Sequence, residues 1–207
     1  MTIRIGINGF GRIGRTYLRA ALAGGADVEV VAVNDLTDAG TLATLLEWDS
    51  VNGHFGGVAV EDDGLRVADR VIKVFSEPEP ARIPWGEVGA DVVIDATGFF
   101  TDREKAAEHL RGGARKVIVS APAKGDVPTF VLGVNDDRLD VSAADVFSNG
   151  SCTTNSLAPL AKVLNDVVGI ETGLMTTVHA YTGDQRLHDA PHRDLRRDRT
   201  PPPPLAC

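Results

Sequence analysis

The sequence has few cysteines, no long apolar run and no excess of positive charge. Two of its 207 residues are cysteines, Cys152 and the final Cys207, which disfavours a disulfide framework and fits a reducing compartment. It contains no stretch of about 18 consecutive apolar residues, and Met1 leads directly into a strand-like segment instead of a targeting sequence. The net charge of −8 disfavours a broad nucleic-acid surface, because phosphate binding needs a positive footprint. These absences predict a cytoplasmic globular protein without a membrane or nucleic-acid partner.

Up to Ser148, short β-branched runs alternate with longer amphipathic segments, a pattern typical of strand–helix–strand units and a mostly parallel sheet. Continuous apolar runs such as Val92-Val93-Ile94 suit strands covered on both faces. The predicted strands span residues 3–7, 28–34, 91–96, 116–120, 129–132 and 145–147, and the predicted helices span residues 13–23, 39–48 and 102–111. Three further short strands, at residues 58–60, 65–67 and 71–75, indicate a small antiparallel insertion.

A glycine-rich segment directly follows the first predicted strand and opens the first predicted helix. Gly9, Gly11 and Gly14 have the spacing of a dinucleotide-binding fingerprint, and Asp35 ends the second strand about 20 residues further on. Gly9 permits the tight turn, Gly11 lets a pyrophosphate approach the backbone, and Gly14 lets the helix pack close to the strand. Because the Asp35 carboxylate would bind an adenosine ribose and repel a 2′-phosphate, the expected cofactor is NAD rather than NADP.

This order of elements favours the binding interpretation over a turn that only joins strand to helix. The predicted fold class is therefore α/β, with a Rossmann-type doubly wound, mostly parallel sheet. Thr97, Gly98 and Ser120 lie at the ends of two later strands, where ligands of open α/β sheets bind, although turn residues also occur there.

The organisation changes after Ser148, which predicts a domain boundary there. Residues 1–148 are the expected nucleotide-binding domain, and residues 149–207 are the expected start of a second domain. A helix is predicted over Cys152–Val168 and a strand over residues 174–182. Residues 186–199 alternate arginine with aspartate, which favours a solvated loop over a binding patch.

Cys152 lies among hydroxyl and amide side chains at the start of that helix. Free N–H groups at a helix start favour thiolate, the form of cysteine that attacks carbonyl carbons, so Cys152 is a candidate nucleophile. The alternative is an inert buried thiol. His179, on the predicted strand, is a candidate base if the fold brings the strand to the helix, and otherwise a structural histidine. No histidine has metal-ligand spacing with the cysteines, so no metal site is expected.

Three segments together resemble the phosphorylating glyceraldehyde-3-phosphate dehydrogenases. They are the opening Ile3-Arg4-Ile5-Gly6-Ile7-Asn8-Gly9-Phe10-Gly11-Arg12-Ile13-Gly14-Arg15, the central Ser151-Cys152-Thr153-Thr154-Asn155, and Thr177-Val178-His179-Ala180-Tyr181-Thr182. The second and third segments are more diagnostic than the glycine pattern. The family includes erythrose-4-phosphate dehydrogenases, so the resemblance specifies the chemistry more firmly than the aldehyde.

The resemblance implies NAD-dependent oxidative phosphorylation of glyceraldehyde 3-phosphate to 1,3-bisphosphoglycerate in glycolysis, by a homotetramer. In the reaction that the resemblance implies, Cys152 is the nucleophile and His179 is the base, while Ser151, Thr153 and Thr182 bind the phosphates. The implied and predicted cofactor contacts are Asn8, Gly9, Phe10, Gly11, Arg12, Ile13, Gly14, Asp35, Thr97, Gly98 and Ser120. The partners are then the aldehyde phosphate and inorganic phosphate.

The match to the family ends near Arg197. Family members continue well beyond this point, whereas this sequence changes and ends in a proline-rich segment, residues 198–207. We expect a truncated catalytic domain with an aberrant tail; a premature end or a reading-frame change explains it better than the alternative, a natural tail. A catalytically inactive NAD-binding fragment is therefore an alternative to an active enzyme.

Overall fold

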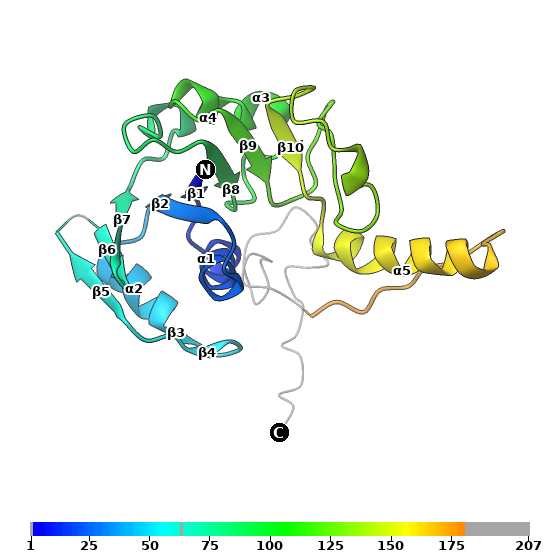
Figure 1. Ribbon diagram of the computed structural model, residues 1–207, viewed down its shortest axis with the longest axis horizontal. Coiled ribbons are helices and arrows are strands. Elements are labelled where there is room, and N and C mark those ends of the chain that lie inside the picture. The colour runs from blue at the N-terminus through cyan, green and yellow to red at the C-terminus, as the bar shows by residue number, and fades with distance from the viewer. Residues whose placement is uncertain (1, 63, 181–207) are drawn as a thin grey trace, which may run out of the picture. The chain divides into compact units, whose positions relative to one another are not determined.

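The computed structural model describes residues 2–62 and 64–180. The chain divides into two units, Met1–Gly169 and Ile170–Cys207. The first unit is built on one eight-stranded sheet with the strand order β10-β9-β8-β1-β2-β7-β6-β5 (Figure 1). Its strands are β1 (Ile3–Asn8), β2 (Val28–Asn34), β5 (Val58–Glu61), β6 (Gly64–Val67), β7 (Arg70–Phe75), β8 (Val92–Asp95), β9 (Lys116–Val119) and β10 (Val146–Ser148).

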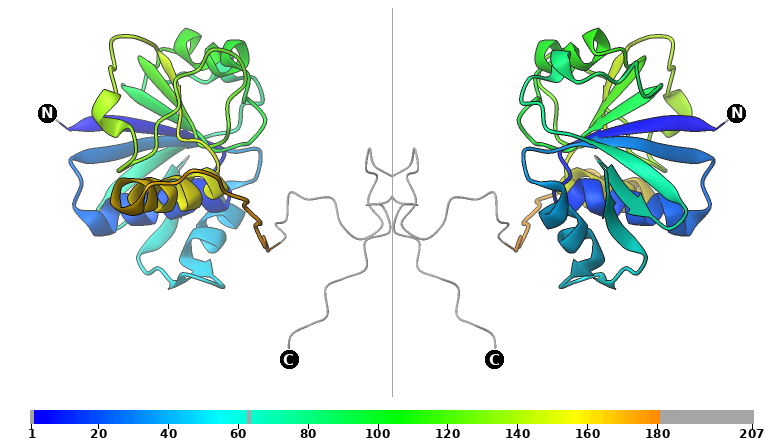
Figure 2. Two further views of the ribbon diagram at one scale, coloured as in Figure 1. Left: turned by 90° about the vertical axis from the view of Figure 1, so that its right-hand side faces the viewer. Right: turned by 90° about the vertical axis from the view of Figure 1, so that its left-hand side faces the viewer.

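The six strands from β10 to β7 run parallel, whereas β7, β6 and β5 pair antiparallel. The predicted fold class is therefore confirmed. The antiparallel insertion predicted between residues 58 and 75 is present, and its last strand, β7, pairs with β2 and so joins it to the main sheet. A second, two-stranded sheet of β3 (Trp48–Asp49) and β4 (Gly53–His54) was not predicted. Successive strands of the large sheet are rotated relative to one another, as Figure 2 shows.

Helices pack on both faces of the sheet (Figure 1). One face carries α1 (Arg12–Gly24) and α2 (Ala39–Glu47), and the core there includes Ile7, Leu18 and Leu46. On the other face lie η1 (Pro80–Arg82), α3 (Arg103–Ala106) and α4 (Glu108–Arg111), with the fully buried Trp85 in the core. Further elements are η2 (Asp136–Arg138) and α5 (Cys152–Val168), whose bounds match the predicted helix.

Three predicted elements differ from the structure. The helix expected over residues 102–111 is two short helices, because bonds such as Leu110 N to Ala107 O tighten the chain at Ala107. The strand expected at residues 129–132 is a single bridge from Thr129 to Ser148, because Val131 turns the chain by pairing with Asn135.

The strand expected over residues 174–182 is also wrong for its described part. Residues 174–180 form no strand, and residues 181 and 182 lie outside the described part of the chain. A strand requires hydrogen-bonded neighbours, and apolar alternation alone does not supply them. The predicted domain boundary after Ser148 stays a prediction.

Candidate functional site

A cleft of about 410 Å³ lies at the carboxyl ends of β1, β2 and β8. Five of the residues predicted to contact a cofactor line it: Asn8, Gly9, Gly11, Asp35 and Thr97. The strand register brings Asn8 beside Asn34 on one side and beside Asp95 on the other. Parallel strands end at the same edge of a sheet, which is why residues far apart in sequence meet in this cleft.

Two of the three fingerprint glycines, Gly9 and Gly14, have a steric reason in the protein itself, and Gly11 does not. Gly9 has φ +87°, and a Cβ there would lie 2.8 Å from the Thr97 backbone nitrogen. A Cβ on Gly14 would lie 2.4 Å from the Gly9 carbonyl oxygen, so glycine is required for the close packing of α1. A Cβ on Gly11 would meet no atom within 4 Å. The Gly11 backbone therefore borders open space in the cleft, and protein packing does not explain that glycine.

Asp35 links the second strand to the glycine-rich turn. One carboxylate oxygen accepts a hydrogen bond from the Phe10 N–H at 2.8 Å, and the other accepts one from the Thr37 N–H at 3.0 Å. The acid predicted to bind a ribose thus also holds the turn in place. Of the other predicted contacts, Phe10 is buried in the core, and Gly98 and Ser120 do not line the cleft.

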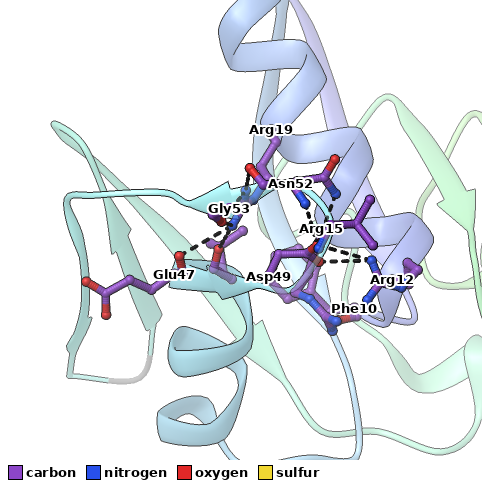
Figure 3. Close-up of polar contacts among 10 residues, drawn as sticks. Phe10, Arg12, Arg15, Arg19, Glu47, Asp49, Asn52 and Gly53 are labelled. Carbon is purple, nitrogen blue, oxygen red and sulfur yellow. Dashed lines mark hydrogen bonds and ion pairs between the residues drawn. The ribbon is translucent and has the colours of Figure 1, made fainter. Parts of the chain in front are cut away.

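The outer face of α1 carries three arginines, and none of their side-chain contacts was predicted (Figure 3). Arg12 donates to both carboxylate oxygens of Asp49, at 3.0 and 3.3 Å. Arg15 donates to the Phe10 carbonyl at 2.8 Å, and Arg19 donates to the carbonyls of Glu47 and Gly53. The spacing of these arginines along one helix face is the signal that could have indicated this contact. Arg12 and Arg19 attach the β3–β4 segment to α1, and Arg15 ties α1 to the glycine-rich turn.

Two of these side chains, Asp49 and Arg15, have shifted pKa values. The pKa of the Asp49 carboxyl is lowered to about 2, first by the backbone N–H groups of Asn52 and Val51 and then by Arg12. Burial lowers the pKa of the Arg15 guanidinium, and the nearby positive charge of Arg12 lowers it further. Asp49 therefore carries its negative charge throughout the neutral pH range.

Several buried polar side chains lie at the cleft and behind it, and of these the sequence predicted only Asn8 as a site residue. Asn8, Asn34, Asp95 and His109 are all at most 4 % exposed. They form one hydrogen-bonded chain with Trp85. Polar residues at strand ends could have suggested part of this chain, but no local pattern links them to a histidine on α4.

Cys152 is the first residue of α5 and is exposed. Gly150, with φ +71°, turns the chain just before it, and the Gly150 N–H donates to the Ser148 hydroxyl at 3.0 Å. The Ser151 hydroxyl caps the helix by accepting from the Thr154 N–H at 2.9 Å. This geometry places a thiol at a helix start, where the backbone stabilises negative charge. Thr153, in the same first turn, is partly buried.

His179 belongs to the second unit and is exposed, and the predicted phosphate contact Thr182 lies outside the described residues. The pairing of Cys152 with His179 stays a prediction. Among residues 2–62 and 64–180, no group of three or more metal-ligating side chains is positioned to hold an ion. Within the same residues, every helix is too short or too polar to span a bilayer.

Comparison with known families gives two matches along the chain. Residues 3–103 match the family described as glyceraldehyde 3-phosphate dehydrogenase, NAD binding domain. Residues 151–202 match the family described as glyceraldehyde 3-phosphate dehydrogenase, C-terminal domain. The first match contains the glycine-rich turn and every residue that lines the cleft, and the second begins at the cap of α5.

Individual relatives agree with this assignment. Glyceraldehyde-3-phosphate dehydrogenase 1 of Streptomyces avermitilis is 58 % identical over 200 residues, covering 96 % of this chain. The proteins of the same name from Geobacillus stearothermophilus and, as number 1, from Bacillus subtilis are 57 % and 56 % identical over the same length. The chain spans about 60 % of the length of these relatives.

Proposed function

Because this chain belongs to the glyceraldehyde-3-phosphate dehydrogenase family, we propose that it takes part in the NAD-dependent oxidative phosphorylation of glyceraldehyde 3-phosphate to 1,3-bisphosphoglycerate. The observation that carries the proposal is the cleft at the ends of β1, β2 and β8, open at Gly11 and bordered by Asp35. The relatives of this chain are named as glyceraldehyde-3-phosphate dehydrogenases, which favours glyceraldehyde 3-phosphate over erythrose 4-phosphate as the substrate.

The residues of the cleft fit NAD. Open space at Gly11 leaves room for a pyrophosphate beside the start of α1, where the first backbone N–H groups lack acceptors within the helix. Asp35 lies on the same cleft, where its carboxylate would accept hydrogen bonds from a ribose and repel a 2′-phosphate. NAD, when bound, supplies the hydride acceptor for oxidation of the aldehyde carbon.

The protein side of the chemistry centres on Cys152. Its thiolate would add to the aldehyde carbon to give a hemithioacetal, which oxidation converts to a thioester. Inorganic phosphate would then attack the thioester carbon, releasing the acyl phosphate and returning the thiolate. The exposure of Cys152 and its place at the start of α5 suit this role.

The remaining roles follow from family membership. His179 is proposed as the base that takes the thiol proton, and Ser151, Thr153 and Thr182 as phosphate contacts. Arg12, Ile13, Gly98 and Ser120 are proposed as further cofactor contacts, although only some of the predicted contacts line the cleft in this structure. A homotetramer in the cytoplasm is the proposed assembly and location.

The test is phosphate-dependent formation of NADH by the purified 207-residue chain supplied with glyceraldehyde 3-phosphate. Cys152→Ser should remove the activity, and Cys207→Ser, which alters the only other cysteine, should not. Calorimetric NAD binding without any NADH formation would contradict the catalytic proposal and leave a binding fragment. Formation of NADH by Cys152→Ser would contradict the assignment of the nucleophile.

A further inference from the structure

The carboxylate of Asp95 is the centre of the hydrogen-bonded series of side chains that runs from Asn34 at the cleft to Trp85 in the core. Its side chain is 0 % exposed and accepts four hydrogen bonds. One oxygen accepts from Asn8 Nδ2 at 2.9 Å and lies 3.0 Å from His109 Nε2. The other accepts from the Thr97 N–H at 3.1 Å and from the Thr97 hydroxyl at 2.7 Å. A buried carboxylate is costly without such donors, so the position of each partner depends on the others.

Trp85 determines which nitrogen of His109 carries the proton. The indole N–H of Trp85 lies 3.0 Å from His109 Nδ1. Because an indole nitrogen only donates, Nδ1 must accept, and the proton of the neutral ring is on Nε2. His109 therefore donates to Asp95, as the carboxylate requires. Loss of the Trp85 donor would permit the other tautomer, which would turn a lone pair of Nε2 toward the carboxylate.

This series of hydrogen-bonded side chains reaches the cleft at several points, although Asp95, His109 and Trp85 do not line the cleft. Asn8 accepts from Asn34 Nδ2 at 2.8 Å, and Asn34 in turn exchanges two hydrogen bonds with the backbone of Glu77. Asn8, Asn34, Glu77 and Thr97 all line the cleft. Phe100, another lining residue, packs edge-on against the His109 ring.

We infer that His109 is a positioning residue for the nucleotide cleft. It holds the Asp95 carboxylate, which fixes Asn8 and Thr97 at the cleft, and Trp85 sets the tautomer that makes this bond. The inference rests on the proposed binding of NAD in the cleft. It adds a residue on α4, outside the cleft, to those that determine cofactor affinity.

The test compares two substitutions of His109 by calorimetric NAD titration of the full chain. His109→Gln keeps an N–H donor near the position of Nε2 and should bind NAD within about twofold of the unaltered protein. His109→Leu has a similar volume without the donor and should raise the Kd about tenfold, or ~1.4 kcal/mol. A role in packing alone would affect both variants alike. Trp85→Phe should also raise the Kd, and Trp48→Phe, an exposed control, should not.

A second measurement needs no substitution at His109. The chain has two tryptophans, so comparison with Trp48→Phe assigns the indole N–H resonance of Trp85 in a ¹⁵N-labelled sample. Added NAD should shift that resonance through the hydrogen-bonded chain, although Trp85 does not line the cleft. If His109→Leu does not fold, the shift of the Trp85 resonance and the NAD titration of Trp85→Phe decide whether His109 positions the cleft.

The outcomes separate the two claims. Failure of the unaltered chain to bind NAD overturns the proposed cofactor and this inference with it. NAD binding with an unmoved Trp85 resonance, or equal affinities for His109→Gln, His109→Leu and the unaltered chain, overturns the inference alone.

Discussion

Helices α1 and α5 both begin directly after a parallel strand and both present a helix start to a candidate site, but they are supported differently. Helix α1 buries Gly14 and Leu18 against the sheet, and its arginines hold the neighbouring β3–β4 segment. Helix α5 buries none of its residues in the described structure, and the Leu160 side chain is 57 % exposed. Helix α1, at the nucleotide site, is therefore stabilised by packing against the sheet, whereas α5 depends on local signals such as its cap.

The largest expected difference is in core packing. Leu18→Ala, at a residue 1 % exposed in α1, should lower the free energy of unfolding by about 3 kcal/mol, because it removes buried methyl groups and leaves a cavity. Leu160→Ala in α5 should lower it by less than about 0.5 kcal/mol. Urea unfolding followed by circular dichroism measures both. Equal losses would show that α5 is packed as α1 is.

A smaller difference is expected at the helix caps. Asp38 caps α2 by accepting from the Thr41 N–H at 2.9 Å, as Ser151 caps α5. Asp38→Ala should lower the global free energy of unfolding by about 1 kcal/mol. Ser151→Ala should instead speed amide exchange in the first turn of α5 with little change in global stability. A global loss in Ser151→Ala equal to that of Asp38→Ala would contradict this contrast.

A still smaller effect on stability is expected when acid protonates Asp49, the partner of Arg12 on α1. The Asp49 pKa is lowered to about 2 in the folded protein, so its stabilising contribution is present above the unfolded pKa of about 3.9 and is lost as the pH falls toward 2. Asp49→Asn should therefore flatten the pH dependence of stability in that acidic window. Thermal melts at a series of pH values measure it, and an unchanged profile would contradict the assignment.

The same contrast explains which features the sequence could predict. Strand β2 and helix α5 have the predicted bounds because apolar pattern and capping are local properties. The segment at residues 174–180 has a strand pattern but forms no strand, since pairing is not a local property. The hydrogen bond between Asn8 and Asp95 joins residues 87 positions apart. The series of hydrogen bonds that leads to His109 could therefore be found only once the strands were placed side by side.

Gly11 tests the central claim, that the cleft binds NAD through the start of α1. Alanine at this position would meet no protein atom within 4 Å, and its φ of −70° suits any residue. Gly11→Ala should therefore unfold at the same temperature as the unaltered chain, yet bind NAD about 100-fold more weakly because the methyl group occupies the space of the pyrophosphate. Calorimetric titration with NAD is the decisive measurement. Equal NAD affinity in Gly11→Ala and the unaltered chain, or no NAD binding by either, would contradict the account.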